Sequence, residues 1–268
     1  MKKNRQQMPN TATNLADVRA NPFRRLFRAA QRWISTLMRE NRATLYIIPS
    51  IFITYLALVG NERVFGKFMF DYVKCGPLSF STHEGYALNA AYWVSFCLAR
   101  LIVFVITLRV SCKLVMAGLL LGTTATSLGM CLIPKDSERA SRIAFFVLST
   151  GFGLFKSPLF PTGLGVINTA VPVTGIITAF VNLGSALGAA LLQFLAGALI
   201  ENHGQVVFPF MVFGTACLLM FCGLSIIWMT RWIINKKSNA ASSSLSLQLD
   251  ACLMNESETS KEVIKSRL

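Results

Sequence analysis

The apolar residues of this chain lie in long blocks that carry little charge, and most blocks are close to the length of a membrane span. A helix needs about 20 apolar residues to cross the hydrocarbon core of a bilayer. Only 14% of the 268 residues are charged, whereas a soluble domain carries about a quarter. The pattern therefore predicts an all-α membrane protein with several membrane-spanning helices.

Six such blocks follow one another with short connections. We expect the spans at roughly 43–73, 86–108, 114–133, 143–164, 173–200 and 206–233. The chain then divides into a basic cytoplasmic segment over 1–42, a six-helix transmembrane bundle over 43–235 and a Ser-rich cytoplasmic tail over 236–268. The composition of this tail is typical of disorder. Two sets of three spans are also the basis of a 3+3 inverted repeat, as in many transporters.

The positive charge is concentrated before the first span. More than half of the net charge of +14 lies in residues 1–42. There, apolar residues at helical spacing between Phe23 and Leu37 alternate with Arg and predict a basic amphipathic helix on the cytoplasmic leaflet. Because Lys and Arg beside spans stay in the cytoplasm, we expect both termini there, in a multi-pass protein of the plasma membrane. This interpretation assigns the charge to orientation and predicts no nucleic-acid partner.

Glu62, Arg100 and Lys156 lie well inside predicted spans, where a charge is costly unless it faces the bundle interior or a water-filled cavity. Glu62 either lies in a broken first helix that lines a binding cavity or follows a helix that ends at Gly60. Arg100 either extends to the cytoplasmic interface or pairs with a buried acid. For Lys156 we favour extension to the interface over pairing with Glu62 or with a carboxylate of a partner domain.

Four further polar or aromatic residues are candidates for contact with a sugar. Asn89 and Trp93 lie one turn apart in the second span, and Asn182 and Gln193 lie in the fifth. Sugars stack on aromatic rings and hydrogen-bond to amides, but aromatic residues near span ends also form interface belts. For Asn182 and Gln193 we favour hydrogen bonds between helices.

Proline and glycine residues mark a bend and a packing face. In "GFGLFKSPLFPTGLG", Pro158 lacks a backbone donor and predicts a kink in the fourth span. Together with Pro161 it makes the inner half of that span a candidate gating element. Gly184 and Gly188 form a GxxxG pair, which is typical of a helix-packing face.

Catalysis and metal binding are not indicated. The sequence contains no nucleophile–His–acid set and no phosphate-binding glycine loop, so we expect no enzyme. Its seven cysteines lack the spacing of a metal site. We therefore expect no metal site and no cofactor other than a coupling ion. A disulfide between Cys75 and Cys131 is compatible with the predicted topology.

Four stretches carry a resemblance to a known family: "LVGNERVFGKFMFDYV", "NAAYWVSFCLARL", "GFGLFKSPLFPTGLG" and "TAFVNLGSALGAALLQFLAGALIENHG". They resemble the C-terminal half of a major facilitator superfamily transporter. The match is closer to the sodium-dependent glucose transporter 1-like group, which is related to fucose–proton symporters. The resemblance covers roughly residues 40–235. It implies one six-helix half of a twelve-helix fold, with a sugar site at the midplane between the halves and alternating access.

By position, Glu62, Asn89, Trp93 and Arg100 match polar or aromatic positions of that group, whereas Lys156 replaces a small or apolar residue. The resemblance implies transport of a glucose-like hexose coupled to Na⁺ or H⁺, with Glu62 as the coupling or sugar-binding carboxylate. Because one half does not enclose a central cavity, we expect an N-terminal half-transporter or a second copy as partner. Two alternatives are a truncated, non-transporting membrane protein and a facilitator-family carrier of a non-sugar solute.

Overall fold

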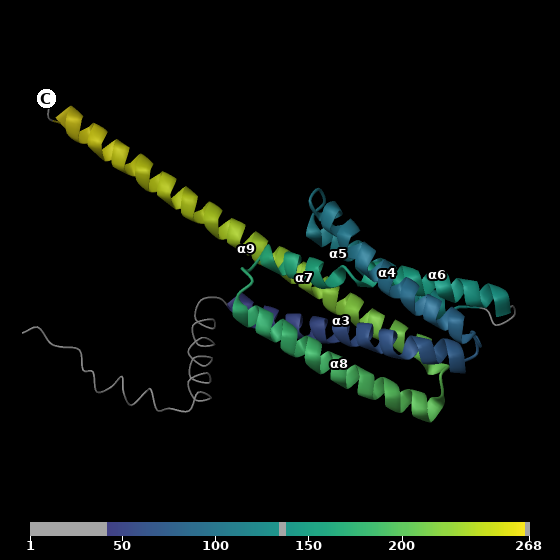
Figure 1. The fold of residues 1–268 in the computed structure, drawn as a ribbon. Coiled ribbons are helices and arrows are strands. Elements are labelled where there is room, and N and C mark those ends of the chain that lie inside the picture. The colour runs from purple at the N-terminus through teal and green to yellow at the C-terminus, as the bar shows by residue number, and fades with distance from the viewer. Residues whose placement is uncertain (1–41, 134–137, 266–268) are drawn as a thin grey trace, which may run out of the picture. The chain divides into compact units, whose positions relative to one another are not determined.

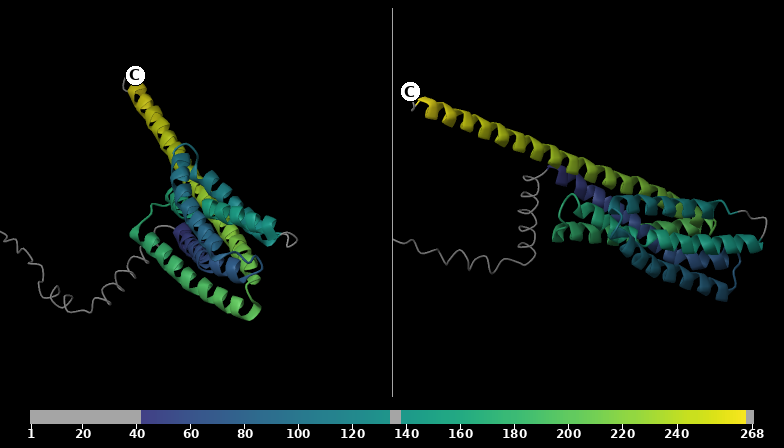
Figure 2. Two further views of the ribbon diagram at one scale, coloured as in Figure 1. Left: turned by 45° about the vertical axis from the view of Figure 1, so that its right-hand side comes forward. Right: turned by 90° about the horizontal axis from the view of Figure 1, so that it is seen from above.

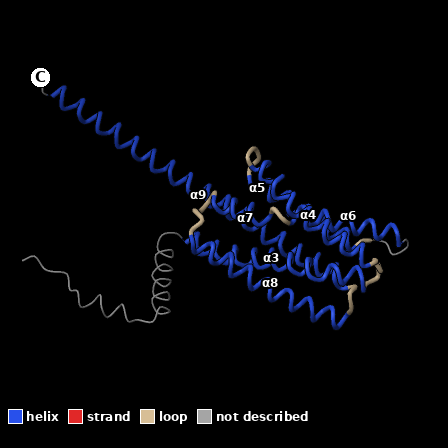
Figure 3. Tube along the Cα trace, viewed as in Figure 1, coloured by secondary structure: helices blue, strands red, loops and turns tan. Residues whose placement is uncertain are grey.

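The computed structural model describes residues 42–133 and 138–265. Within those ranges the chain forms helices joined by short turns and no strand (Figure 3). Six helical segments there are long and apolar enough to cross a membrane, so the predicted all-α membrane fold is confirmed. The amphipathic helix predicted between Phe23 and Leu37 lies outside the described residues. From residue 47 on, the helices considered below belong to the compact unit of residues 47–268.

The spans pack lengthwise into one bundle (Figures 1 and 2). The helices are α3 (Arg42–Cys75), α4 (Thr82–Thr107), α5 (Cys112–Cys131), α6 (Glu138–Lys156), α7 (Leu159–Asn168), α8 (Gly175–His203) and α9 (Val207–Lys265). The fourth span consists of α6 and α7 together, and each of the other spans is a single helix. α4 packs along α6, and α5 packs along α6 and α9.

α3 is one continuous helix through the middle of its span. Both interpretations of the Glu62 region are therefore wrong on this point, because the helix neither breaks at Glu62 nor ends at Gly60. The glycines serve packing instead. A Cβ on Gly60 would lie 2.6 Å from the Gly188 carbonyl oxygen, and one on Gly66 would lie 3.3 Å from the Trp93 ring. Small residues at helix contacts let neighbouring elements approach without any bend.

The fourth span is interrupted at its middle. α6 ends at Lys156, and α7 begins directly after Pro158, where the sequence predicts a kink. Neither Pro158 nor Pro161 has the N–H that a continuous helix would donate to the carbonyls of Leu154 and Ser157. The interruption therefore leaves two carbonyl oxygens next to Lys156 without their usual helical donors.

α8 lies directly against α3 through the GxxxG pair. A Cβ on Gly184 would lie 2.7 Å from the carbonyl oxygen of Phe52, and one on Gly188 would overlap the carbonyl oxygen of Leu56. Only glycine leaves room for this approach of the two backbones. The contact fixes α8 beside the half of α3 that precedes Glu62.

Aromatic rings fill the core between four helices. The Phe65 ring of α3 lies at the centre of this cluster, 5.0 Å from the Tyr92 ring of α4 and 4.6 Å from the Phe152 ring of α6. The Phe208 ring of α9 lies 5.7 Å from it. All four side chains are fully buried. Offset and tilted ring pairs stabilise such a core beyond the apolar area they bury, so the cluster fixes these helices one turn away from Glu62.

α9 extends well past its membrane span. The span ends at Asn239, whereas the helix continues to Lys265. The tail predicted to be disordered over 236–268 is therefore helical as far as the structure describes it. The physical reason is that no Pro or Gly follows Lys236, so no residue of the tail breaks a helix. At about 1.5 Å per residue, α9 is roughly three times as long as the hydrocarbon core is thick.

Candidate functional site

Lys156 is buried inside the bundle. Its side chain is 1% exposed, although it lies near the middle of a span and ends α6. The predicted extension of this side chain to the cytoplasmic interface is therefore wrong. The ammonium instead lies 6.0 Å from the centroid of the Phe152 ring. The physical reason is that Lys156 lies one turn from Phe152, whose fully buried ring packs on the Phe65 ring of α3.

Glu62 is the acidic partner of this site. It lies near the middle of α3 and is partly buried. Lys156, Arg100 and Arg63 lie within electrostatic range of its carboxylate. The structure thus brings together three of the predicted site residues, Glu62, Arg100 and Lys156, from three different helices. None of these three cations forms an ion pair or a hydrogen bond with Glu62 among the described residues.

Arg100 is held in place by the residue that follows Lys156. Its Nε donates a 3.0 Å hydrogen bond to Ser157 Oγ, and Ser157 Oγ donates a 2.6 Å hydrogen bond to the Phe96 carbonyl oxygen. The guanidinium also lies 4.9 Å from the centroid of the Phe96 ring. Arg100 is otherwise exposed. It therefore connects α4 to the interruption between α6 and α7, within electrostatic range of Glu62.

Two buried polar atoms at this site lack hydrogen-bond partners in the described part of the chain. They are Lys156 Nζ and the Tyr92 hydroxyl, and Tyr92 also lies in the field of the Glu62 carboxylate. Tyr92 approaches α6 closely because Gly153 has no side chain, since a Cβ there would lie 2.9 Å from the Tyr92 ring. Unfilled hydrogen-bonding groups of this kind are uncommon in a protein interior and mark sites of function.

Trp93 presents part of its ring at the surface of the bundle. It is 40% exposed, and its ring packs on Gly66 and against the rings of Tyr92 and Phe96. Asn89, one turn earlier on α4, is partly buried. Gly66 is one turn from Glu62 on α3, so an exposed aromatic surface and the acidic side chain lie near each other.

Asn182 and Gln193 lie elsewhere, on α8. Asn182 is exposed and Gln193 is partly buried, and neither makes a side-chain hydrogen bond to the described residues. The hydrogen bonds between helices that the sequence predicts for them are therefore not found there. Asn61 fills that role instead. It is fully buried, and its Nδ2 donates to the Val212 carbonyl at 3.2 Å and to Thr215 Oγ1 at 2.7 Å.

A cavity lies beside the interruption of the fourth span. It has a volume of about 460 Å³, and Arg100, Pro158 and Pro161 all line it. Phe104 and Thr162 line it as well. This cavity places both prolines of the candidate gating element next to an arginine that reaches the charged site.

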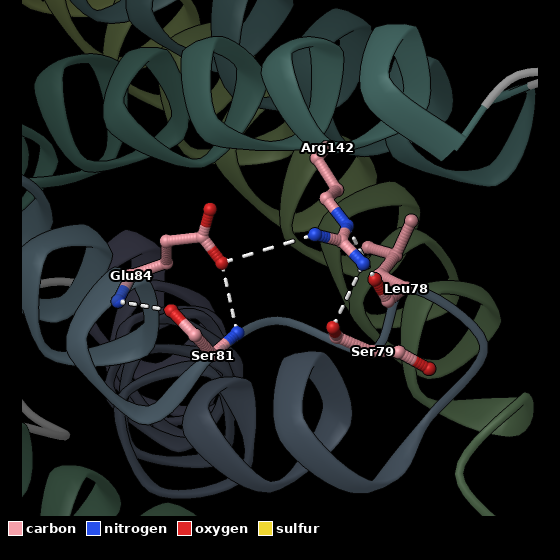
Figure 4. Close-up of polar contacts among 5 residues, drawn as sticks. All are labelled: Leu78, Ser79, Ser81, Glu84 and Arg142. Atoms are coloured by element: carbon pink, nitrogen blue, oxygen red, sulfur yellow. Dashed lines mark hydrogen bonds and ion pairs between the residues drawn. The ribbon is translucent and has the colours of Figure 1, made fainter.

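A polar network connects the N-terminal ends of α4 and α6, far along α6 from Lys156 (Figure 4). Arg142 donates from Nε to the Leu78 carbonyl and from Nη2 to the Ser79 carbonyl, each at 2.9 Å. Its Nη1 lies 3.9 Å from Glu84 Oε2. Glu84 also forms a capping box with Ser81 at the start of α4. The Ser-x-x-Glu pattern that begins at Ser81 is the signal of this cap in the sequence.

The described residues contain no cluster of three or more His, Cys, Asp or Glu side chains arranged to hold a metal. Cys75 and Cys131 are both free thiols in the structure, so the disulfide considered for them is not formed there. The chemistry of the site therefore lies in its charges, its hydrogen-bonding groups and an exposed indole ring.

The chain is similar in sequence to several proteins named as membrane transporters. Sodium-dependent glucose transporter 1 of Danio rerio is 29% identical over 62% of this chain and 27% of that protein. Sodium-dependent glucose transporter 1 of Rattus norvegicus is 26% identical over 60% of this chain and 32% of that protein. Major facilitator superfamily domain-containing protein 4B of Danio rerio is 26% identical over 63% of this chain and 30% of that protein. No family model and no solved structure matches.

These matches confirm the resemblance to major facilitator superfamily transporters of that group. The aligned part of the chain spans 27% to 32% of the length of these relatives. Together with six helical segments able to cross a bilayer in the described ranges, they support a multi-pass membrane protein.

Proposed function

We propose that this chain is one six-helix half of a carrier that moves a glucose-like hexose across the plasma membrane by alternating access. Two matched relatives carry the name sodium-dependent glucose transporter 1. The observation that carries the proposal is the burial of ionisable groups near the middle of two spans, with Lys156 1% exposed and Glu62 partly buried. Ionisable groups at this depth are costly and mark a substrate or ion pathway.

The chemistry around Glu62 suits a sugar. A carboxylate accepts hydrogen bonds from hydroxyl groups, and the exposed face of Trp93 offers an aromatic surface for stacking on a pyranose ring. Asn89 adds an amide one turn away. Asn182 and Gln193 would contribute only if the completed carrier brought the exposed face of α8 to the sugar.

In our proposal, the complete carrier consists of this chain and a second half. An N-terminal half-transporter or a second copy would supply the other wall of the central cavity, with both termini of this chain in the cytoplasm. Coupling to Na⁺ or H⁺ would act through Glu62. The interruption at Pro158 would allow the inner part of the fourth span to move as a gate, because a helix bends most easily where backbone hydrogen bonds are missing.

Uptake of labelled hexose tests this proposal. The chain is purified from its native membrane with any subunits that accompany it and is reconstituted into liposomes. We expect saturable glucose uptake that unlabelled hexoses compete for and that organic cations and anions do not. Competition by an organic ion alone would favour the non-sugar carrier, and no uptake of any solute would favour a non-transporting protein.

A pair of tryptophan variants tests the stacking surface. Trp93→Ala is expected to raise the KM for glucose severalfold, up to about tenfold, since an aromatic contact contributes about 0.5–1.5 kcal/mol. Trp228 of α9 is 69% exposed, and Trp228→Ala serves as the matched control with unchanged uptake. Equal KM values for the two variants would remove Trp93 from the sugar site.

A further inference from the structure

We propose that the cavity between α4 and the start of α7 is a binding site for a small organic monocarboxylate with an apolar body, whose carboxylate pairs with Arg100. The cavity has a volume of about 460 Å³, which is the size of a pocket for a small organic ligand. Neither Glu62 nor Trp93 is among the residues that line it. The site is therefore separate from the sugar surface proposed above and does not depend on that function.

Arg100 has hydrogen-bonding capacity to spare on its guanidinium. It lies inside a membrane span and is exposed. Its Nε donates to Ser157 Oγ at 3.0 Å, whereas Nη1 and Nη2 form neither a hydrogen bond nor an ion pair with the described residues. A cation at this depth is costly unless an opposite charge or water meets it. The two terminal amino groups of the planar guanidinium match the two oxygens of a carboxylate.

The guanidinium is directed away from the nearer end of α4. That helix ends at Thr107, seven residues beyond Arg100, which is about 10 Å along the axis. The guanidinium instead lies 4.9 Å from the centroid of the Phe96 ring, one turn in the opposite direction. Lipid headgroups lie outside the hydrocarbon core, so this group does not extend toward them. The anion that it fits is a molecule that enters the cavity, not the phosphate of a neighbouring lipid.

Apolar side chains form most of the wall around Arg100. Phe104 lines the cavity from α4, and Pro158, Phe160 and Pro161 line it from the other side. A single charged group in a largely apolar wall is typical of pockets that orient a small molecule by its charge and bury the rest of it. The wall therefore selects an aromatic or short alkyl body attached to the carboxylate.

The end of the cavity near the turn between α4 and α5 has further positive charge close by. Thr107 and Cys112 line this end. Arg109 lies in the turn and is exposed, and Lys113 follows Cys112 and is partly buried. Among the described residues, no Asp or Glu lines the cavity. Cationic side chains raise the local concentration of anions, so the surroundings favour a carboxylate over an amine of the same shape.

Binding of tritiated 4-phenylbutyrate tests the site. The purified full chain, with any subunits that accompany it, is placed in nanodiscs of neutral lipid. Neutral 4-phenylbutanol and cationic 4-phenylbutylamine serve as competitors of similar shape. We expect one saturable site from which the unlabelled acid displaces the probe. The alcohol and the amine should be weaker competitors by about tenfold or more, because hydrogen bonds to charged groups are the stronger ones.

Two substitutions of Phe104 test the charge pair without removing Arg100. Phe104 is 66% exposed and follows Arg100 by one turn of α4, so Phe104→Glu places a carboxylate of the chain itself beside the guanidinium. This variant should bind the acid about tenfold or more weakly than Phe104→Gln, which has the same length and no charge.

A pair of arginine variants tests the same contact from the other side. Arg100→Gln should also lower the affinity for the acid about tenfold or more. Arg231→Gln is the control, because Arg231 of α9 is exposed and does not line the cavity, and it should bind as wild type. If Arg100→Gln does not fold, the two Phe104 variants still decide the question.

Several results would overturn the inference. They are the absence of saturable binding, equal displacement by the acid, the alcohol and the amine, and equal affinity of Phe104→Glu and Phe104→Gln. Loss of binding in nanodiscs that contain phosphatidylglycerol would show that an acidic lipid occupies the cavity, which would also overturn it. Displacement of the acid by glucose would contradict a separate site. Absence of hexose uptake by the reconstituted assembly would contradict the proposed function and leave this binding measurement unaffected.

Discussion

Arg100 and Ser157 join two helices at the point where the fourth span is interrupted. Arg100 Nε donates to Ser157 Oγ at 3.0 Å, and Ser157 Oγ donates to the Phe96 carbonyl oxygen at 2.6 Å. Ser157 directly precedes Pro158, so this pair of hydrogen bonds lies at the point about which α7 would rotate against α6. The relationship therefore couples the candidate gate to a charge that acts on Glu62.

Removing the Ser157 hydroxyl should weaken this connection. Ser157→Ala loses two hydrogen bonds between helices, each worth about 0.6 kcal/mol in a membrane protein, so we expect a loss of about 1 kcal/mol in the free energy of unfolding. Among the described residues, Ser185 hydrogen-bonds only within its own helix α8, and Ser185→Ala is the control. The check is the midpoint of thermal unfolding in detergent. Equal midpoints for the two variants would show that the Arg100–Ser157 contact carries no net stability.

A methyl group at Gly188 should separate α8 from α3. Its Cβ would overlap the Leu56 carbonyl oxygen, which belongs to the backbone and has little freedom to move. Overpacking of this kind costs about 1–3 kcal/mol, so Gly188→Ala should lower the unfolding midpoint and the yield of folded protein. At Gly197 of the same helix, an added Cβ would be 4.0 Å from the Phe68 ring. Gly197→Ala is therefore expected to match wild type, and an equal loss in both variants would contradict the packing account.

Replacement of Asn61 should lower the stability of the protein, whereas replacement of Asn182 should not. Asn61→Leu removes hydrogen bonds to Val212 and Thr215 inside the core, and it also forces a differently shaped side chain into a buried position. We expect a loss of about 1–3 kcal/mol. Asn182→Leu changes an exposed position and should leave the unfolding midpoint within about 1 °C. A larger loss of unfolding free energy in Asn182→Leu than in Asn61→Leu would contradict the assignment of the interhelical hydrogen bonds to Asn61.

Composition and block length were enough to predict the fold class. The membrane class follows from apolar block length, because the hydrocarbon core sets the length of a helix that crosses it. The interruption of the fourth span follows from Pro158, because a missing N–H acts locally. Both signals depend on residues close together in the sequence, so they can be read without knowledge of the packing.

The continuity of the helix at Glu62 and the burial of Lys156 depend on contacts between helices that are far apart in the sequence. The Gly60–Arg63 stretch has the composition of a helix end, yet α3 continues because Gly60 packs on α8. Lys156 has a stem long enough to reach an interface, yet the side chain is buried inside the bundle beside Phe152. The helical tail is a further case, since its Ser-rich composition indicates disorder but includes no residue that breaks a helix.

The most direct test of the account is hexose uptake by the reconstituted assembly carrying Glu62→Gln. This variant keeps the size of the side chain and removes the charge that Lys156 and Arg100 act on. We expect loss of at least about nine tenths of the saturable glucose uptake, because a buried charge site at this depth is part of the pathway. Glu201→Gln, at an exposed position near the end of α8, should retain full uptake. If Glu62→Gln is expressed normally and takes up glucose as fast as wild type, the central claim that this charged site is required for transport is contradicted.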